Sequence, residues 1–241
     1  ALPIWAAYLN TAQQVLDLLD QATVRTEQGI ADLTGSLRVW SSPGFGLNIL
    51  PSLLARMSAL HPRLHVETTV SDAQPNFALG TDVAIFPTTR PLRNSALIMR
   101  KIMKWTNVFV ASPGYLARNP APARPSQLAD HQLILGGEQA REQIEIALLR
   151  KGAPKDKREK IVLRPTATSL DINFVRQCCI FGGGVSFLPA FMAADDLKGG
   201  RLKTVLEDYE SESFSGNLYV LYRKTKTIAP KVKAFLAFLS P

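Results

Sequence analysis

The sequence has few of the residues that carry covalent or metal chemistry. Its two cysteines, Cys178 and Cys179, are adjacent, and its three histidines are scattered at positions 61, 65 and 131. Adjacent cysteines make neither a disulfide framework nor a metal-ligand pattern. No serine or cysteine lies in a nucleophile turn, and GxSxG, HExxH and phosphate-loop motifs are absent. We therefore expect no catalytic residue, no metal and no cofactor, and hence not an enzyme.

Long hydrophobic runs are also missing. The longest, such as residues 180–192, are interrupted by glycine and are shorter than the roughly 20 residues of a membrane-spanning helix. The first residues lack the order of a secretory signal peptide, and the chain does not begin with methionine. With 241 residues, 46% of them hydrophobic and 20% charged, we expect a globular cytoplasmic fragment of one large domain or two lobes.

Basic charge exceeds acidic charge, and part of the excess is concentrated. The net charge is +8, and residues 150–164 hold seven basic and two acidic side chains. No aromatic residue lies between these charges to stack on nucleic-acid bases. We expect a solvated hairpin loop there, with a phosphate contact as the alternative.

Residues 36–70 have the pattern of a strand, a helix and a second strand. Residues 37–40 favour a strand, and residues 64–68 alternate between apolar and polar. Pro51 must lie in the first turn of the helix, since deeper it would remove a hydrogen bond at a cost of roughly 3 kcal/mol. Pro62 ends the helix. The predicted apolar stripe of this helix is Leu47, Leu50, Leu54, Met57 and Leu60.

The amino-terminal residues predict a long linker helix. Apolar residues from Ile4 to Ala22 recur in steps of four and three, which is the spacing of a coiled-coil seam. Gly29 and Gly35 separate this segment from the first strand. We expect residues 1–34 to form a dimerisation helix, with a core helix of the same domain as the alternative.

The rest of the chain alternates strands and helices, which indicates an α/β protein. Three consecutive glycines, Gly182, Gly183 and Gly184, are expected to stop the second long helix. Strands are predicted at 83–86, 96–105, 107–111, 133–135, 185–188, 202–206 and 218–222, a hairpin at 144–149 and 160–163, and helices at 169–181, 189–197 and 230–239.

Six segments, in this order, resemble one family: LTGSLRV, LPSLLARMSALHPRLHVE, DVAIF, FVASPGYLA, GGGVSFLPAFMAADDLKGGRL, and LYVLY followed by APKVKAFLAFL. Together they resemble the regulatory half of a LysR-type transcriptional regulator, with its linker helix but without the preceding winged helix-turn-helix. The resemblance implies a two-lobed type 2 periplasmic-binding-protein-like fold with two crossover strands. Lobe I would comprise residues 35–108 and 216–241, and lobe II residues 109–215.

The resemblance also implies a function. The chain would sense a small organic effector, such as an organic acid, in a cleft between the lobes and transmit its binding to the DNA-binding domain by a shift between conformations. Implied partners are the effector, further copies of the chain in a homodimer or homotetramer, DNA through the preceding domain, and RNA polymerase, but no membrane. A solute-binding receptor of a transport system is the alternative, although a heptad helix at its start would be unexpected.

The effector site is expected at the carboxyl ends of the parallel strands, where strand-to-helix turns present free N–H groups. Gly44 stands where many members of the family have a serine or threonine that holds the effector, which argues against a carboxylate clamp built on that hydroxyl. The alternative is that these residues only close turns. The candidates are Ser41, Ser42, Gly44, Phe45, Ser71, Asp72 and Phe86 in lobe I, and Gly136, Gly137, Thr168 and Ser169 in lobe II.

Three further expectations concern assembly, the cysteines and one loop. By resemblance, the helix at 46–60 should pair with the helix at 169–181 of a second copy across a two-fold axis. Cys178 and Cys179 should be buried small residues and no redox sensor, because a bond between helical neighbours would be strained. The short segment 70–82 should trim the second helix of lobe I.

Overall fold

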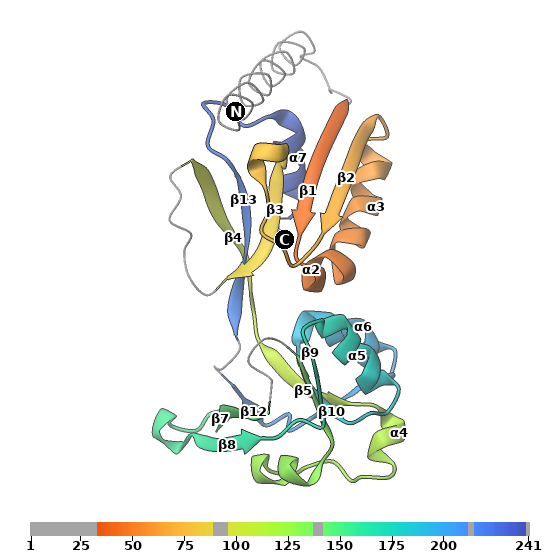
Figure 1. The fold of residues 1–241 in the computed structure, drawn as a ribbon, viewed down its shortest axis with the longest axis vertical. Coiled ribbons are helices and arrows are strands. Elements are labelled where there is room, and N and C mark those ends of the chain that lie inside the picture. Colours follow the sequence, from red (N-terminus) through yellow and green to blue (C-terminus); the bar gives the residue numbers. More distant parts are fainter. Residues whose placement is uncertain (1–32, 89–95, 137–141, 212–214, 240–241) are drawn as a thin grey trace, which may run out of the picture. The chain divides into compact units, whose positions relative to one another are not determined.

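The computed structural model describes residues 33–88, 96–136, 142–211 and 215–239. The predicted linker helix, apart from its last two residues, and Gly137 lie outside these ranges. The chain divides into two compact units (Figure 1). Unit 1 comprises Ala1–Ile102 and Leu218–Pro241, and unit 2 comprises Met103–Asn217.

Unit 1 is built on a five-stranded sheet with the strand order β2-β1-β3-β13-β4. The two neighbours of β1 both run parallel to it. The continuous apolar run Val83, Ala84 and Ile85 in β3 is completely buried, as expected for a parallel strand inside a sheet. The strands are β1 (Gly35–Ser41), β2 (Leu64–Val70), β3 (Val83–Thr88), β4 (Leu97–Trp105) and β13 (Gly216–Arg223).

Two helices connect β1 to β2, where one was expected. They are α2 (Pro43–Asn48) and α3 (Leu50–Leu60), and the chain bends between them at Ile49, with φ −120° and ψ −45°. Each helix has a proline in its first turn, where the missing N–H costs nothing, so the position predicted for Pro51 is confirmed. The end of α3 before Pro62 is also confirmed, since His61 caps it and donates its N–H to Met57 O at 2.8 Å.

The predicted apolar stripe is wrong at both ends. Leu47 is 55% exposed and Leu60 is 66% exposed, whereas Leu50, Leu53 and Met57 are buried. The bend at residue 49 changes the rotational phase between the helices, and position 60 is the last residue of α3. A single helical repeat across 47–60 therefore does not describe the buried face.

The carboxyl-terminal helix α7 (Pro230–Phe238) belongs to unit 1 and packs against α3. Its Phe235 is completely buried, and the ring of Phe238 lies edge-on to His61, with centroids 6.3 Å apart. Between β2 and β3 the structure has one 3₁₀ turn, η1 (Phe77–Leu79), in place of a full helix. This agrees with the trimming expected for segment 70–82.

Unit 2 has a five-stranded sheet with the order β11-β5-β10-β6-β9 and a three-stranded sheet with the order β12-β7-β8. The predicted hairpin is confirmed, because β7 and β8 pair antiparallel. The strands are β5 (Asn107–Ala111), β6 (Leu133–Gly136), β7 (Ile144–Arg150), β8 (Glu159–Leu163), β9 (Ala167–Ser169), β10 (Val185–Pro189), β11 (Lys203–Val205) and β12 (Tyr209–Glu210).

The helices of unit 2 differ from the prediction mainly at their starts. Helix α5 begins three residues later than expected, because residues 167–169 form strand β9 and Asp171 is the N-cap. The other helical segments are α4 (Pro113–Leu116), α6 (Ala190–Lys198) and the 3₁₀ turns η2 (Pro125–Asp130) and η3 (Lys155–Lys157), while α5 is Ile172–Ile180.

The glycines after α5 stop it, as predicted. The N–H of Gly182 bonds to Cys179 O at 3.0 Å and that of Gly183 to Cys178 O at 2.9 Å, and Gly182 has a left-handed φ of +84°. A side chain on Gly183 would place its Cβ only 2.5 Å from Cδ1 of Ile134. A larger residue at position 183 would therefore force the Ile134 side chain to move where the helix turns into β10.

The chain passes between the units within β4 and β13, because the divisions after Ile102 and before Leu218 fall inside these strands. Within the ranges described, no helix combines the length and apolar character needed to span a membrane.

Candidate functional site

The candidate residues of lobe I gather at the carboxyl edge of three parallel strands. In β1, Ser41 is in register with Val70 of β2 and with Ile85 of β3. The residues that follow, Ser42, Ser71 and Phe86, therefore lie at the same edge of the sheet. The backbone fixes this edge, since Ser71 N–H donates to Ser41 O and Ser42 N–H donates to Ile85 O, both at 3.0 Å.

The start of α2 lies at this edge without a side-chain cap. Ser42 is the N-cap residue and accepts the N–H of Gly46 at 2.8 Å through its backbone oxygen, but its hydroxyl makes no capping bond. Pro43 has no N–H to offer. The first-turn amides, including that of Gly44, and the Ser42 hydroxyl are thus polar groups that the start of α2 can present to a ligand.

Other candidates in unit 1 serve the packing or turns of that unit. Ser41 is completely buried and donates its hydroxyl to Ser42 O at 3.1 Å, and Phe45 is 2% exposed. The Ser71 hydroxyl accepts the N–H of Ala73 at 3.1 Å, which is ordinary turn chemistry.

Two of the unit 1 candidates lie nearer the surface. Phe86 is half-buried and meets Trp40 edge-on, with ring centroids 6.2 Å apart. Asp72 is exposed. Phe86 is therefore the aromatic candidate that keeps accessible surface at this edge.

The candidates of lobe II also come together, at the carboxyl edge of β6 and β9. Gly136 is in register with Ser169, and Leu135 with Thr168. A Cβ on Gly136 would lie 2.5 Å from Cδ1 of Ile172, so glycine lets α5 begin close to β6. Ser169 accepts the N–H of Asp171 at 3.1 Å, whereas Thr168 is exposed. Thr168 is thus the hydroxyl of this set that remains accessible.

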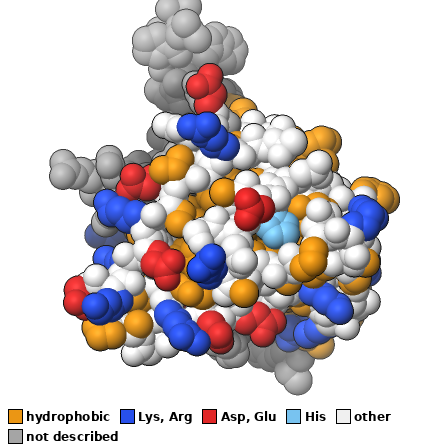
Figure 2. Space-filling model, turned by 90° about the horizontal axis from the view of Figure 1, so that it is seen from below, with side chains coloured by type: hydrophobic (Ala, Val, Ile, Leu, Met, Phe, Trp, Pro, Cys, Tyr) orange, Lys and Arg blue, Asp and Glu red, His pale blue; other side chains and the backbone are white. Residues whose placement is uncertain are grey.

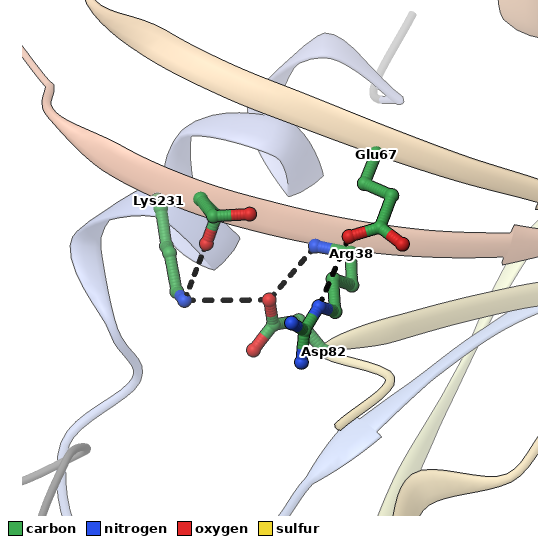
Figure 3. A network of polar contacts seen from close by, with 5 residues as sticks. Arg38, Glu67, Asp82 and Lys231 are labelled. Carbon is green, nitrogen blue, oxygen red and sulfur yellow. Dashed lines mark hydrogen bonds and ion pairs between the residues drawn. The ribbon is translucent and has the colours of Figure 1, made fainter. Parts of the chain in front are cut away.

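An ion-pair network in unit 1 was not predicted (Figure 3). Arg38 donates its backbone N–H to a carboxylate oxygen of Asp82 at 2.9 Å, and its side-chain Nε–H to Glu67 at 3.1 Å. Lys231 of α7 binds the same Asp82 oxygen at 3.3 Å and Ser36 O at 2.7 Å. Arg38 and Glu67 are register partners in β1 and β2, so the strand pairing was the sequence feature that could have revealed their contact.

A buried carboxylate in unit 2 was also missed. Asp196 of α6 has no exposed surface and binds Nε of Arg176 at 2.5 Å and Nε of Arg201 at 2.6 Å. These contacts connect α6 to α5 and to the turn before β11. The carboxylate is fully used inside unit 2, so we assign it to the fold.

Neither cysteine is in a disulfide. Cys179 is completely buried and points its Sγ at Val110 O and Gly184 O, both at 3.4 Å, while Cys178 is half-buried. Burial raises the pKa of Cys179 to about 11, so at neutral pH it is a thiol rather than a reactive thiolate. The burial predicted for Cys179 is confirmed.

His131 lies in a small hydrogen-bonded cluster of unit 2. The Tyr115 hydroxyl accepts the N–H of Gln132 at 3.1 Å and lies 3.1 Å from Nδ1 of His131, to which it can donate. Burial lowers the pKa of His131, and the nearby Asp130 partly offsets this. Across the ranges that the structure covers, no group of three or more His, Cys, Asp or Glu side chains is arranged to hold a metal ion.

A family model, described as the LysR substrate binding domain, matches residues 31–241. Among curated proteins, the HTH-type transcriptional regulator CrgA of Neisseria meningitidis is 27% identical over 236 residues, which cover 97% of this chain and 76% of that protein. The full-length structure of AphB, a Vibrio cholerae virulence activator and member of the LTTR protein family, matches with a TM-score of 0.70 at 26% identity. That match covers 94% of this chain and 75% of AphB.

The regulatory domain of CrgA matches with a TM-score of 0.70 at 24% identity, covering 86% of this chain and 98% of that domain. This likeness concerns the fold. Together with the two units and their two connecting strands, it confirms the predicted two-lobed periplasmic-binding-protein-like α/β fold.

Proposed function

The chain belongs to the LysR substrate-binding domain family and is the effector-binding domain of a LysR-type regulator, and from this premise we propose that its effector is a small organic molecule held at the carboxyl edges of the parallel strands. The observation that carries the proposal is the convergence of Ser42, Ser71 and Phe86 at one edge of unit 1. Thr168 and Ser169 form the corresponding edge of unit 2.

The groups at these edges favour a ligand with a polar end and an apolar body. The uncapped first turn of α2 offers N–H donors, which suit an anionic oxygen such as that of an organic acid. The ring of Phe86 offers a flat apolar surface. Ser42 adds a hydroxyl group that makes no capping bond, and Thr168 adds a hydroxyl group on an exposed residue.

A thermal-shift screen with small organic acids tests this site. Ser42→Ala and Thr168→Val should each weaken binding of the stabilising acid by about 1 kcal/mol or more, which is roughly fivefold in Kd, because each removes a hydrogen bond to the ligand. Ser58→Ala, on an exposed position of α3, and Thr204→Val, in β11, are the matched controls and should leave the shift unchanged. A ligand whose stabilisation survives both site changes would locate the pocket elsewhere.

The assembly expected from the family has support in the exposed apolar side chains. On unit 1, Leu47, Leu60 and Val70 are exposed on α2, α3 and the end of β2. On unit 2 the exposed set is Leu170, Phe174 and Phe181, on and beside α5. We infer that these two surfaces pair in a homo-oligomer across a two-fold axis, so that each copy contributes both surfaces.

Sedimentation of charge-bearing variants tests the pairing. Phe174→Glu or Leu60→Glu should dissociate the oligomer at micromolar concentration, because each places a charge in an apolar contact. Val162→Glu is the control, since Val162 is 51% exposed on β8, outside both surfaces. Wild-type protein that sediments as a monomer at tens of micromolar would contradict the inference.

The remaining parts of the function rest on the relatives. They are named as transcriptional regulators, which does not favour a transport receptor or an enzyme. We infer a non-catalytic sensor that acts in the cytoplasm, with DNA contacted through a domain that precedes residue 1.

A further inference from the structure

A basic loop follows β13 in unit 1. Residues 223–227, RKTKT, hold three basic side chains and none that is acidic. Lys224 and Lys226 are exposed, and neither has an acidic partner within the ranges that the structure covers. Their charges are therefore available to an outside partner.

The backbone of this loop is held in place. Lys224 donates its N–H to Ala96 O at 3.0 Å, and the Thr225 hydroxyl donates to Thr227 O at 2.8 Å. The guanidinium of Arg223 bonds to Phe77 O in η1. The two lysines thus extend from a fixed base, which reduces the entropy lost when a partner binds.

The acidic side chains nearest the loop already have basic partners outside it. Arg38 lies at the other end of η1, since a Cβ on Gly80 would be 2.5 Å from its guanidinium. Glu67 pairs with Arg38, and Asp82 pairs with Lys231 (Figure 3). The acids closest to this edge are consequently committed to other cations.

The more basic segment of the chain, the β7–β8 hairpin, is a weaker candidate. Two of its basic side chains have acidic partners: Lys160 pairs with Glu145 at 3.2 Å, and Arg150 lies 3.9 Å from Asp208. Figure 2 shows one face of the molecule, on which basic and acidic side chains are interspersed. A mixed surface has little net attraction for a polyanion.

We propose that residues 223–227 bind the phosphate backbone of duplex DNA without reading its sequence. Lysine and arginine are the usual phosphate contacts, and such binding depends on charge alone. No aromatic side chain lies within the loop to stack on unpaired bases, which favours a duplex over a single strand.

The test uses the 241-residue chain and a fluorescent 20-base-pair duplex of arbitrary sequence in anisotropy titrations from low to moderate salt. The wild type should bind at low salt. Lys224→Glu/Lys226→Glu should weaken binding by about tenfold or more and lower the slope of log K against log salt by about 2, since each phosphate contact contributes roughly 0.9.

The matched control is Lys151→Glu/Lys157→Glu in the hairpin, which changes the net charge equally. It should leave both affinity and slope near those of the wild type, and melting curves should show all three proteins folded. Equal weakening by the two double variants would overturn the proposal, because it would show attraction by overall charge. Absence of wild-type binding at the lowest salt, or equal competition by polyglutamate, would also overturn it.

Discussion

Unit 1 keeps its ion pairs near the surface, whereas unit 2 buries the carboxylate of one ion pair completely. In unit 1, the side chains of Arg38 and Glu67 are 49% and 56% exposed, and those of Lys231 and Asp82 are 18% and 22% exposed. In unit 2, Asp196 is inaccessible between two arginines. Exposed pairs contribute little to stability, but a buried charge that loses its partner is costly. The buried ion pair of unit 2 is therefore expected to matter more for stability than the exposed pairs of unit 1.

The balance of charge follows the same division. The described part of unit 1 has ten basic and three acidic side chains, and that of unit 2 has fourteen and eleven. The excess is thus +7 in unit 1 and +3 in unit 2, although unit 2 has more charged residues. Most charges of unit 2 are balanced by opposite charges within that unit. Unit 1 therefore has the larger net positive charge with which to attract a polyanion.

Asp196→Ala should give the largest loss of stability. It leaves Arg176, whose side chain is 17% exposed, without a counter-charge, at a cost of about 3 kcal/mol or more. Urea unfolding would measure the loss, and hydrogen exchange should place it in α5, α6 and β10. Asp195→Ala, at the exposed neighbouring position, should change stability by less than about 0.5 kcal/mol. Similar losses in both variants would break the contrast between buried and surface charge.

Gly184→Ala should give the second-largest loss of stability. Gly184 has a φ of +151°, and an added Cβ would collide with the backbone oxygen of Gln132 in unit 2. Gly80→Ala is the matched change in unit 1, where φ is +98° and the neighbour is the movable guanidinium of Arg38. We expect a loss of about 2 kcal/mol or more for Gly184→Ala and about 1 kcal/mol for Gly80→Ala, measured as urea midpoints. The opposite order would show that unit 1 is the more rigidly packed.

Asp82→Asn should have a smaller effect that depends on salt. The side-chain oxygen of asparagine can still accept the backbone N–H of Arg38. The change therefore removes mainly the charge attraction to Lys231. We expect a loss of about 1 kcal/mol at low salt that shrinks as salt is added. Glu67→Gln, in the more exposed pair, should lose less than about 0.5 kcal/mol. A salt-independent loss for Asp82→Asn would indicate a packing defect.

The smallest expected effect is on the pH dependence of stability, through His131 in unit 2. Burial lowers the pKa of His131 below its ordinary 6.5, so below that pH the unfolded chain binds a proton that the folded chain does not. The contribution of His131 to stability is therefore complete above about pH 6.5 and declines as the pH falls through that value. His131→Gln should flatten the fall in urea midpoint between about pH 7 and pH 5.5. An unchanged slope in the variant would assign the pH dependence to other groups.

The positions where the parallel strands end were predictable, because they follow from the local order of apolar and polar residues along the chain. The apolar run in β3 and the polar residues directly after β1 and β2 mark where parallel strands end, and the structure aligns Ser41 with Val70 and Ile85. Helix α2 was missed because its sequence, PGFGLN, contains two glycines and a proline that favour a turn. Strand β9 was missed because its three residues are too short to show a period.

Which side chains at the edges stay accessible depended on packing. Ser42 and Ser71 look equivalent in sequence, yet Ser71 closes a turn while the Ser42 hydroxyl makes no cap. Phe45 and Phe86 were both predicted as effector-site residues, but Phe45 is 2% exposed and Phe86 is half-buried. Such differences depend on neighbours that local periodicity does not identify.

Most of the helices and strands, and the ends of α3 and α5, could be predicted from the sequence alone, because proline geometry, glycine conformations and hydrophobic period act over a few residues. Which charges meet depends instead on how the chain packs in three dimensions. The bond from Lys231 to Ser36 joins residues 195 positions apart, and that from Arg176 to Asp196 spans 20 positions and two helices. An ion pair depends on distance in space, and the chain brings these partners together only after its sheets and helices have packed.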